Sequence, residues 1–206
     1  MLTLFWSPGA CSFVPHVGLE STKAAFEAKL VKLHRGEQRT PEYLALNPNA
    51  QVPVLVADGK PLTQILAICE FLDLTFPEAA LLPKGAWERA QALSQLAWMN
   101  STPHTTMTRW FFPERYAESE GARGEIKQRA AQDFRAHLGR LQDMVPQMRG
   151  ALHEAYAFTL LRWGGFAGVD PRSLPQLRAC VEKAMQGDAF KAALARERIA
   201  LDTYKG

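Results

Sequence analysis

One cysteine stands where a short apolar segment passes into a predicted helix, within Ser7-Pro8-Gly9-Ala10-Cys11-Ser12. The first turn of a helix presents unpaired N–H groups and a partial positive charge, which favour a thiolate and lower the pKa of the thiol. Val14 occupies the place of the second cysteine of a CxxC pair, so a dithiol cycle within the chain is disfavoured. Cys11 is therefore predicted to act alone, by forming a mixed disulfide or polarising a bound thiol. The alternative is an inert, buried cysteine.

A second candidate segment, Asn47-Pro48-Asn49-Ala50-Gln51-Val52-Pro53-Val54, precedes a predicted hairpin. Proline is tolerated at the first position of a strand, and a cis Val52–Pro53 bond would expose the backbone of Val52 for pairing with an extended peptide. Gln64 begins the next predicted helix, where free N–H groups suit the carboxylate of a ligand. The alternative for Gln64 is a polar helix cap.

His104 follows Pro103 at a break in a helical pattern. An imidazole with a pKa near neutrality can hold or accept a proton at a thiol, whereas the alternative is a surface or capping histidine. Aromatic residues flank it and could line an apolar pocket, although core or dimer-interface packing explains them equally well. They are Trp98, Trp110, Phe111 and Phe112.

The remaining histidines do not form a catalytic pattern. His153 and Glu154 are adjacent, and adjacent side chains on a helix point in different directions, so both are predicted to be solvated. His16, His34 and His137 are assigned no role. Cys69 and Cys180 lie in predicted helices and are expected to be buried packing residues.

The elements that must position these residues alternate between strand and helix over the first 80 residues. Strands are predicted at Leu2–Ser7, Phe26–Leu33, Val52–Ala57 and Lys60–Thr63, and helices at Ser12–Thr22, Thr40–Leu46 and Gln64–Leu74. Asp58-Gly59 is a favoured two-residue turn, which makes the last two strands a hairpin.

Beyond the segments Phe76-Pro77-Glu78 and Leu82-Pro83-Lys84-Gly85 the pattern is helical. Two stripes of apolar residues recur at three- and four-residue intervals and are predicted to pack in a core. They are Trp87, Ala90, Leu93, Leu96 and Ala97, and Ile126, Ala130, Phe134, Leu138 and Leu141. Further helices are predicted at Leu152–Trp163, Leu174–Met185 and Ala189–Glu197. A small α/β domain followed by an all-helical one is the predicted architecture.

Composition narrows the function classes. The chain has 206 residues, 47% of them apolar, and 24 Lys+Arg against 21 Asp+Glu, so it is expected to be globular rather than disordered. Basic residues are interspersed with acids, which disfavours nucleic-acid binding. Neither a membrane span nor a signal peptide is predicted. Three widely spaced cysteines suit reduced thiols in a cytoplasm, and no Cys/His spacing predicts a metal site.

Four sequence motifs, in this order along the chain, resemble those of the glutathione transferase superfamily, and most closely those of its bacterial beta class. They are Ser7-Pro8-Gly9-Ala10-Cys11-Ser12-Phe13-Val14-Pro15-His16, Asn47-Pro48 with Gln51-Val52-Pro53-Val54-Leu55, Asp58-Gly59 with Leu62-Thr63-Gln64, and Ala67-Ile68 with Phe71-Leu72. The resemblance covers the first domain with matching spacing and the second domain more loosely. It implies a thioredoxin-like glutathione-binding domain over residues 1–77 and an all-helical domain over 86–206 that lines an electrophile site.

The resemblance also implies roles for single residues. Cys11 corresponds to the thiol at the glutathione sulfur and His104 to the histidine on the first long helix of the second domain that reaches the active site. The expected glutathione contacts are Arg35, Gln51, Val52, Pro53, Gln64 and Ile65. Glutathione would be the co-substrate and a small apolar electrophile the other partner, in a cytoplasmic homodimer without a metal.

Two departures from the family pattern modify this expectation. Ile65 stands where the family usually has Ser or Thr, so only its N–H is left for the γ-glutamyl carboxylate, and its branched side chain could crowd the ligand. Loss of one hydrogen bond to a charged group costs ~1.5–3 kcal/mol of binding. Ala151-Leu152-His153-Glu154 replaces a Ser/Thr capping box, which predicts a displaced helix start or a loss of about 1 kcal/mol of stability.

The sequence therefore predicts a glutathione transferase that acts on a small apolar electrophile. Conjugation, thiol reduction of a mixed disulfide and glutathione-dependent isomerisation would use the same site, and the residues do not choose among them. The alternative from another class is a binding or interaction protein that kept the fold and lost glutathione turnover, as Ile65 suggests.

Overall fold

The computed structural model describes residues 1–205, which form a four-stranded sheet and nine α-helices joined by short 3₁₀ turns. The strands are β1 (Leu2–Trp6), β2 (Phe26–Leu30), β3 (Val54–Ala57) and β4 (Lys60–Thr63). The helices are α1 (Phe13–Thr22), α2 (Pro41–Leu46), α3 (Ile65–Thr75), α4 (Ala86–Ser101), α5 (Pro103–Phe111), α6 (Glu120–Met144), α7 (Ala151–Phe166), α8 (Pro175–Ala184) and α9 (Asp188–Glu197).

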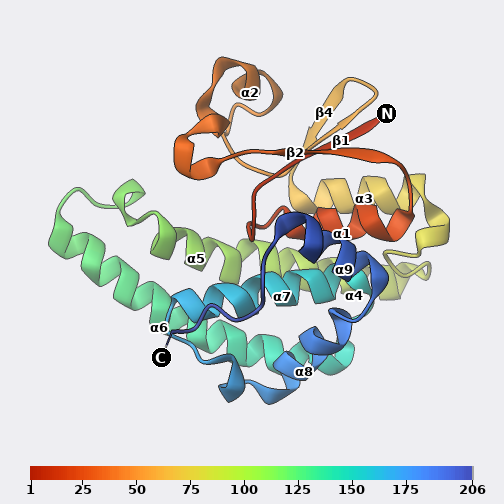
Figure 1. The fold of residues 1–206 in the computed structure, drawn as a ribbon. Coiled ribbons are helices and arrows are strands. Elements are labelled where there is room, and N and C mark those ends of the chain that lie inside the picture. The colour runs from red at the N-terminus through yellow and green to blue at the C-terminus, as the bar shows by residue number, and fades with distance from the viewer. Residues whose placement is uncertain (206) are drawn as a thin grey trace.

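The sheet has the strand order β2-β1-β3-β4, with β1 parallel to β2 and the other pairs antiparallel. Alternate residues of the strands face two different clusters, as the two-residue period of a strand requires. Leu4 and Leu55 join the main core, whereas Val54 packs with Tyr43 of α2 in a smaller cluster. Figure 1 shows α2 on one side of the sheet and α1 and α3 on the other. The expected thioredoxin-like domain is confirmed.

Two boundaries follow from residues with positive φ. Asp58 and Gly59 have φ of 49° and 79°, so the predicted hairpin turn forms where predicted. β2 ends at Leu30 rather than Leu33, because the chain enters a short 3₁₀ turn at Leu33–Arg35 that is closed by Gly36 with φ 74°.

Helix α1 is buried on nearly every side because it lies between the sheet and the C-terminal helices (Figure 1). Phe13, its first residue, packs against Phe158 of α7 with ring centroids 4.7 Å apart and against Phe190 of α9 at 5.3 Å. One core cluster therefore runs through both halves of the chain. This shared core ties α7 and α9 to the element that follows Cys11.

The predicted helical half is confirmed, with one correction to its stripes. Ala130, Phe134, Leu138 and Leu141 are buried along α6 as expected. On α4 only Leu96 of the predicted stripe is buried, together with Ala92 and Met99, whereas Ala90 and Ala97 are exposed and Trp87 is 71% exposed. Helices α3, α5 and α7 all contact α4. The apolar spacing alone could not show which face of α4 they cover.

Helix α7 starts at Ala151, directly after Gly150 with φ 82°, and has no side-chain cap at its N-terminus. The missing capping box therefore leaves the helix start close to the predicted Leu152. His153 is wholly buried, which contradicts the prediction that it is solvated. Its Nδ1 lies 2.8 Å from the Arg149 carbonyl and its Nε2 lies 3.1 Å from the Ala92 carbonyl. These partners on a loop and on α4 replace the water that the sequence prediction assumed.

Candidate active site

The loop between β1 and α1 carries Cys11 and is closed by its own side chains. Ser12 is fully buried, and its Oγ accepts from the Ser7 N–H at 3.1 Å and donates to the Ser7 carbonyl at 3.3 Å. Both backbone groups of Ser7 are thereby satisfied by one hydroxyl, which fixes the width of the loop. Cys11 sits in the turn just before α1, as the sequence predicted.

The Cys11 thiol is half-buried and donates to the Val52 carbonyl, with Sγ and O 3.4 Å apart. Burial raises the pKa of Cys11 to about 12, although the backbone N–H groups of Cys11 and Ser12 act in the opposite direction. The negative charge of Glu197 raises this pKa further. The prediction of a lowered thiol pKa is therefore wrong for this structure, because the desolvation of a thiolate outweighs the helix start.

The segment before β3 is held from α2. Tyr43 Oη and Asn47 Nδ2 both donate to the Gln51 carbonyl at 2.8 Å, which anchors the turn that leads into Val52. The Val52–Pro53 bond is cis, as predicted, and both residues are buried. The Gln51 side chain is exposed beside them.

Gln64 and Ile65 adjoin this segment through the pairing of β3 with β4. Val54 pairs with Thr63, so Pro53 and Gln64, the next residues on each strand, lie at the same end of the hairpin. Gln64 is exposed with φ 72°, and α3 begins after it without a side-chain cap. The first N–H groups of α3 are therefore without a capping side chain, which suits an anionic ligand.

The Ile65 side chain is only 4% exposed and belongs to the main core cluster. The expectation that it crowds a ligand is thus wrong, because the first residue of α3 directs its side chain inward. Arg35 stands apart from this group, on an exposed 3₁₀ turn after β2. Within residues 1–205 its side chain has no hydrogen bond or ion pair, so the structure does not bring it to the other predicted residues.

His104 is the second residue of α5, after the break at Thr102 that separates α5 from α4. Its Nδ1 lies 2.8 Å from Tyr156 Oη, and the Tyr156 hydroxyl donates to Asn100 Oδ1 at 2.9 Å. A phenol has one proton, so its oxygen must accept from His104. Nδ1 of His104 therefore carries the ring proton and Nε2 is left as an acceptor.

Burial lowers the pKa of His104 to about 4. The imidazole is therefore neutral at neutral pH, and its Nε2 can accept a proton. The sequence motifs assigned no role to Tyr156, which lies 52 residues from His104, or to Asn100, which lies only four residues before it but reaches it through Tyr156.

Trp163 of α7 contacts both His104 and the loop from Ser7 to Ser12 that carries Cys11, called the thiol loop below. Its Nε1 donates to the Gly9 carbonyl at 2.9 Å, and its ring centroid lies 5.1 Å from that of His104. Phe111 packs edge-on against Trp163 at 5.6 Å, which brings one of the predicted pocket aromatics to this cluster. Trp98 instead packs against Arg140 of α6, with the guanidinium 4.8 Å from the ring.

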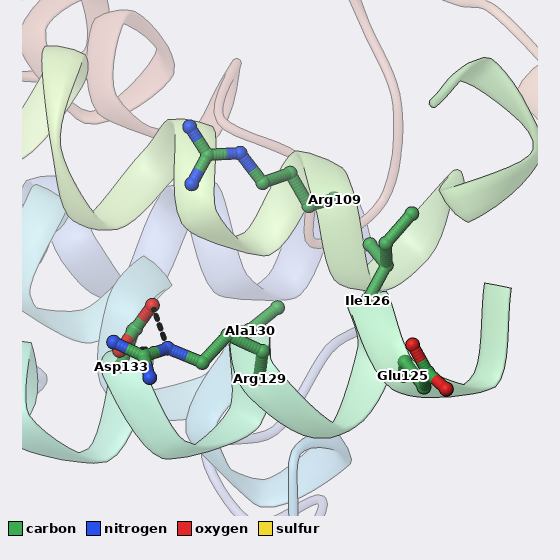
Figure 2. Close-up of a pocket in the computed structure, with 6 residues that line it drawn as sticks. All are labelled: Arg109, Glu125, Ile126, Arg129, Ala130 and Asp133. Atoms are coloured by element: carbon green, nitrogen blue, oxygen red, sulfur yellow. Dashed lines mark hydrogen bonds and ion pairs between the residues drawn. The ribbon is translucent and has the colours of Figure 1, made fainter. Parts of the chain in front are cut away.

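A different groove lies between α5 and α6 (Figure 2). It has a volume of about 290 Å³ and is lined by Arg109, Glu125, Ile126, Arg129, Ala130 and Asp133. Figure 2 shows the ion pair of Arg129 with Asp133 along its edge. No predicted site residue lines this groove, so it is separate from the Cys11–His104 cluster.

Two further observations concern the described residues. None of their helices is long and apolar enough to span a bilayer. Within residues 1–205 no His, Cys, Asp and Glu side chains are grouped in a way that could hold a metal ion. Cys11, Cys69 and Cys180 are free thiols; Cys69 is buried as predicted, whereas Cys180 is only half-buried.

The chain combines a thioredoxin-like domain with an all-helical half, which is the architecture that the resemblance to the glutathione transferases predicted. The family described as glutathione S-transferase, N-terminal domain, matches residues 1–74. Glutathione S-transferase GST-4.5 of Xanthomonas campestris pv. campestris is 32% identical over 207 residues, which cover 95% of this chain and 98% of that protein. The chain belongs to the glutathione S-transferase family.

Two solved structures agree over nearly the whole chain. A bacterial beta class glutathione S-transferase of Sphingomonas chungbukensis is 32% identical, with a TM-score of 0.83, and covers 96% of this chain and 100% of its own. A sphingomonad glutathione S-transferase complexed with glutathione is 31% identical, with a TM-score of 0.80 and the same coverage. The likeness to the beta class that the sequence suggested is confirmed.

Proposed function

We propose that this protein is a glutathione transferase that conjugates glutathione to a small apolar electrophile. Residues 1–77 form the glutathione-binding domain and residues 86–206 line the electrophile site. The observation that carries the proposal is the 3.4 Å approach of the Cys11 thiol to the Val52 carbonyl, beside the uncapped start of α3. A tripeptide thiol that pairs with Val52 would bring its sulfur to Cys11 and its γ-glutamyl carboxylate to α3.

The glutathione contacts follow from this pose. Val52 pairs with the cysteinyl unit next to Pro53, and the Gln64 side chain and the Ile65 N–H hold the γ-glutamyl carboxylate. Gln51 is exposed at the end of this segment and contacts the same peptide. Arg35 is proposed as a longer-range contact to the glycyl carboxylate, since its side chain is exposed and unpaired within residues 1–205.

The chemistry divides between the two catalytic residues. Cys11 has a pKa of about 12, so it stays protonated and is not the nucleophile. When glutathione binds, the Cys11 S–H turns from the Val52 carbonyl to the glutathione sulfur and donates its one hydrogen bond there. His104 is neutral, and its Nε2 accepts a hydrogen bond from the glutathione thiol and relays the thiol proton to water, because a pKa of about 4 does not let the imidazole retain it. The resulting thiolate forms the C–S bond with the electrophile, and the leaving group departs with its bonding electrons.

The raised pKa of Cys11 also favours conjugation over thiol reduction. A mixed-disulfide reductase needs its own cysteine as thiolate to attack a disulfide sulfur. The electrophile site is proposed at the aromatic residues Trp163 and Phe111, which pack beside His104. An apolar electrophile suits such a wall.

A homodimer is part of the proposal, as the family resemblance implies. Leu74 and Trp87 are large apolar side chains, 68% and 71% exposed, and they belong to the neighbouring helices α3 and α4. Burial of such residues stabilises association. Light scattering coupled to size exclusion tests the proposal, and a mass of one chain over the working concentration range would contradict it.

The test of glutathione binding is an isothermal titration of reduced glutathione into wild type, Gln64→Ala, Cys11→Ala and a matched control, Gln91→Ala. Gln91 is an exposed glutamine on α4, away from the site. Wild type and Gln91→Ala are expected to bind alike. Loss of a hydrogen bond to the carboxylate should weaken binding to Gln64→Ala by about tenfold to a hundredfold.

Turnover is then measured with a panel of small aromatic and alkyl halides, in wild type and His104→Gln. His104→Gln is expected to retain glutathione binding and lose most of kcat. No heat at millimolar glutathione would refute the proposed ligand. Binding without turnover of any electrophile would instead support the alternative, a protein that kept the fold as a binding module.

A further inference from the structure

Gly9, two residues before Cys11, has both of its backbone groups held by side chains from the C-terminal half of the chain. Its N–H donates to Glu197 Oε2 at 2.9 Å, and its carbonyl accepts from Trp163 Nε1 at 2.9 Å. Glu197 is the last residue of α9, and Trp163 lies on α7. The thiol loop is therefore clamped from two helices that lie more than 150 residues away in the sequence.

The clamp is buried and favours glycine at its centre. Gly9 has φ 63°, and a Cβ there would overlap the guanidinium of Arg162. Glu197 is 3% exposed, and its other oxygen, Oε1, lies 2.8 Å from Nδ1 of the fully buried His16 on α1. One carboxylate thus connects the start of the loop with the helix that follows it.

Charges from every neighbouring helix surround this carboxylate. Burial raises the pKa of Glu197, while His16, the Gly9 N–H and Arg162 of α7 act in the opposite direction. Glu20 of α1 lies 3.8 Å from His16 Nε2 and pairs with Arg196 of α9 at 3.1 Å. An anion held this far from water persists only where such partners compensate it. Of these partners, His16 belongs to α1, the Gly9 N–H to the thiol loop and Arg162 to α7.

We propose that Glu197 is a positioning residue, which holds the loop at Gly9 and thereby keeps the Cys11 thiol against Val52. α9 then controls access to the thiol, because the loop from Ser7 to Cys11 can leave this position only when the Gly9–Glu197 hydrogen bond opens. The Trp163–Gly9 bond is the second half of the same clamp. This role does not depend on the ligand, so it can be tested without glutathione.

The assay is the rate at which iodoacetamide alkylates each cysteine, followed by mass spectrometry of the separate peptides. The chain provides its own references, because Cys69 is buried in the core and Cys180 is half-buried on α8. A local release of the loop accelerates Cys11 alone. Global unfolding accelerates Cys69 together with it, and circular dichroism shows that loss of structure independently.

Glu197→Ala removes the acceptor of a charge-assisted hydrogen bond, so the Cys11 rate is expected to rise about tenfold to a hundredfold. Glu197→Gln keeps an oxygen that accepts from Gly9 and is expected to restore a rate within about threefold of wild type. The matched control is Glu182→Ala on α8, whose exposed carboxylate pairs with Arg178 at 2.7 Å. It is expected to leave all three rates unchanged.

A second variant covers the case in which Glu197→Ala unfolds. Trp163→Phe keeps an aromatic ring but removes the indole N–H that holds the Gly9 carbonyl, together with part of the ring volume. It is expected to accelerate Cys11 severalfold, with Cys69 still protected. The proposal is overturned if Cys11 in a folded Glu197→Ala or Trp163→Phe protein reacts within twofold of the wild-type rate. It is equally overturned if Glu197→Gln reacts as fast as Glu197→Ala, because the charge and not the anchoring would then govern the thiol.

Discussion

Tyr156 connects His104 to Asn100, and its replacement by Phe tests the proton arrangement derived for the site. The Tyr156 hydroxyl lies 2.8 Å from His104 Nδ1 and 2.9 Å from Asn100 Oδ1, and the side chain is completely buried. Phe keeps the ring and its packing. The substitution therefore removes two hydrogen bonds and little else.

The expected loss of stability follows from the two groups left behind. A buried donor or acceptor without a partner costs about 1–3 kcal/mol, and His104 Nδ1 and Asn100 Oδ1 are both part-buried. We expect the free energy of unfolding of Tyr156→Phe to fall by about 2–4 kcal/mol. Urea titration measures it, and Tyr116→Phe is the matched control because Tyr116 is 51% exposed.

The change in His104 is the more specific readout. In wild type at pH 7, two-bond proton–nitrogen NMR correlations are expected to show a neutral ring with the proton on Nδ1. Tyr156→Phe frees the ring to place its proton on Nε2, which blocks the proposed base, so kcat should fall about tenfold or more. A wild-type His104 that is charged at pH 7, or that carries its proton on Nε2, would refute this reasoning.

Three further outcomes are expected. Burial lowers the pKa of His104 in the folded protein to about 4 from 6.5, so the unfolded chain takes up the proton first as the pH falls. The free energy of unfolding, measured by urea titration, should therefore fall by about 3 kcal/mol between pH 6.5 and 4. In His104→Gln this part of the loss should be absent. Because the Ile65 side chain lies in the core, Ile65→Ser should lower the free energy of unfolding by about 2–4 kcal/mol and should not tighten the Kd for glutathione. A tighter Kd by calorimetry would place that side chain at the ligand. Arg89 of α4 pairs with Asp73 and Glu70 of α3 at 2.7 Å, and Asp73 is nearly buried. Arg89→Ala should therefore lower the free energy of unfolding by about 2 kcal/mol, measured by thermal unfolding. An unchanged Tm would show that solvent screens the two ion pairs.

The sequence alone predicted the first domain well, because its signals are local. Asp58-Gly59 can form only a narrow set of turns, and both residues do adopt positive φ. Val52 before Pro53 predicted the cis bond, and the strand-to-helix transition placed Cys11 correctly. The apolar spacing along α6 likewise identified the residues that became buried.

Predictions that depend on the surroundings of a residue were less successful. The start of a helix lowers a thiol pKa, yet burial raises that of Cys11 to about 12, and no local pattern reports how deeply a thiol will be covered. His153 was expected in solvent and the Ile65 side chain against the ligand, and both side chains face the core. Which face a neighbouring helix covers is decided by packing between elements distant in the chain.

The chemistry of the site belongs to the tertiary structure for the same reason. Sequence motifs named Cys11, Val52, Gln64 and His104 one at a time. The partners that set their protonation and position lie far away in the sequence. Tyr156 is 52 residues from His104, and Trp163 and Glu197 are 154 and 188 residues from Gly9. Such contacts form only when α7 and α9 close on α1. Local sequence thus determined the fold of the first domain and which residues could react, whereas long-range packing decided which atoms carry protons and what holds the thiol in place.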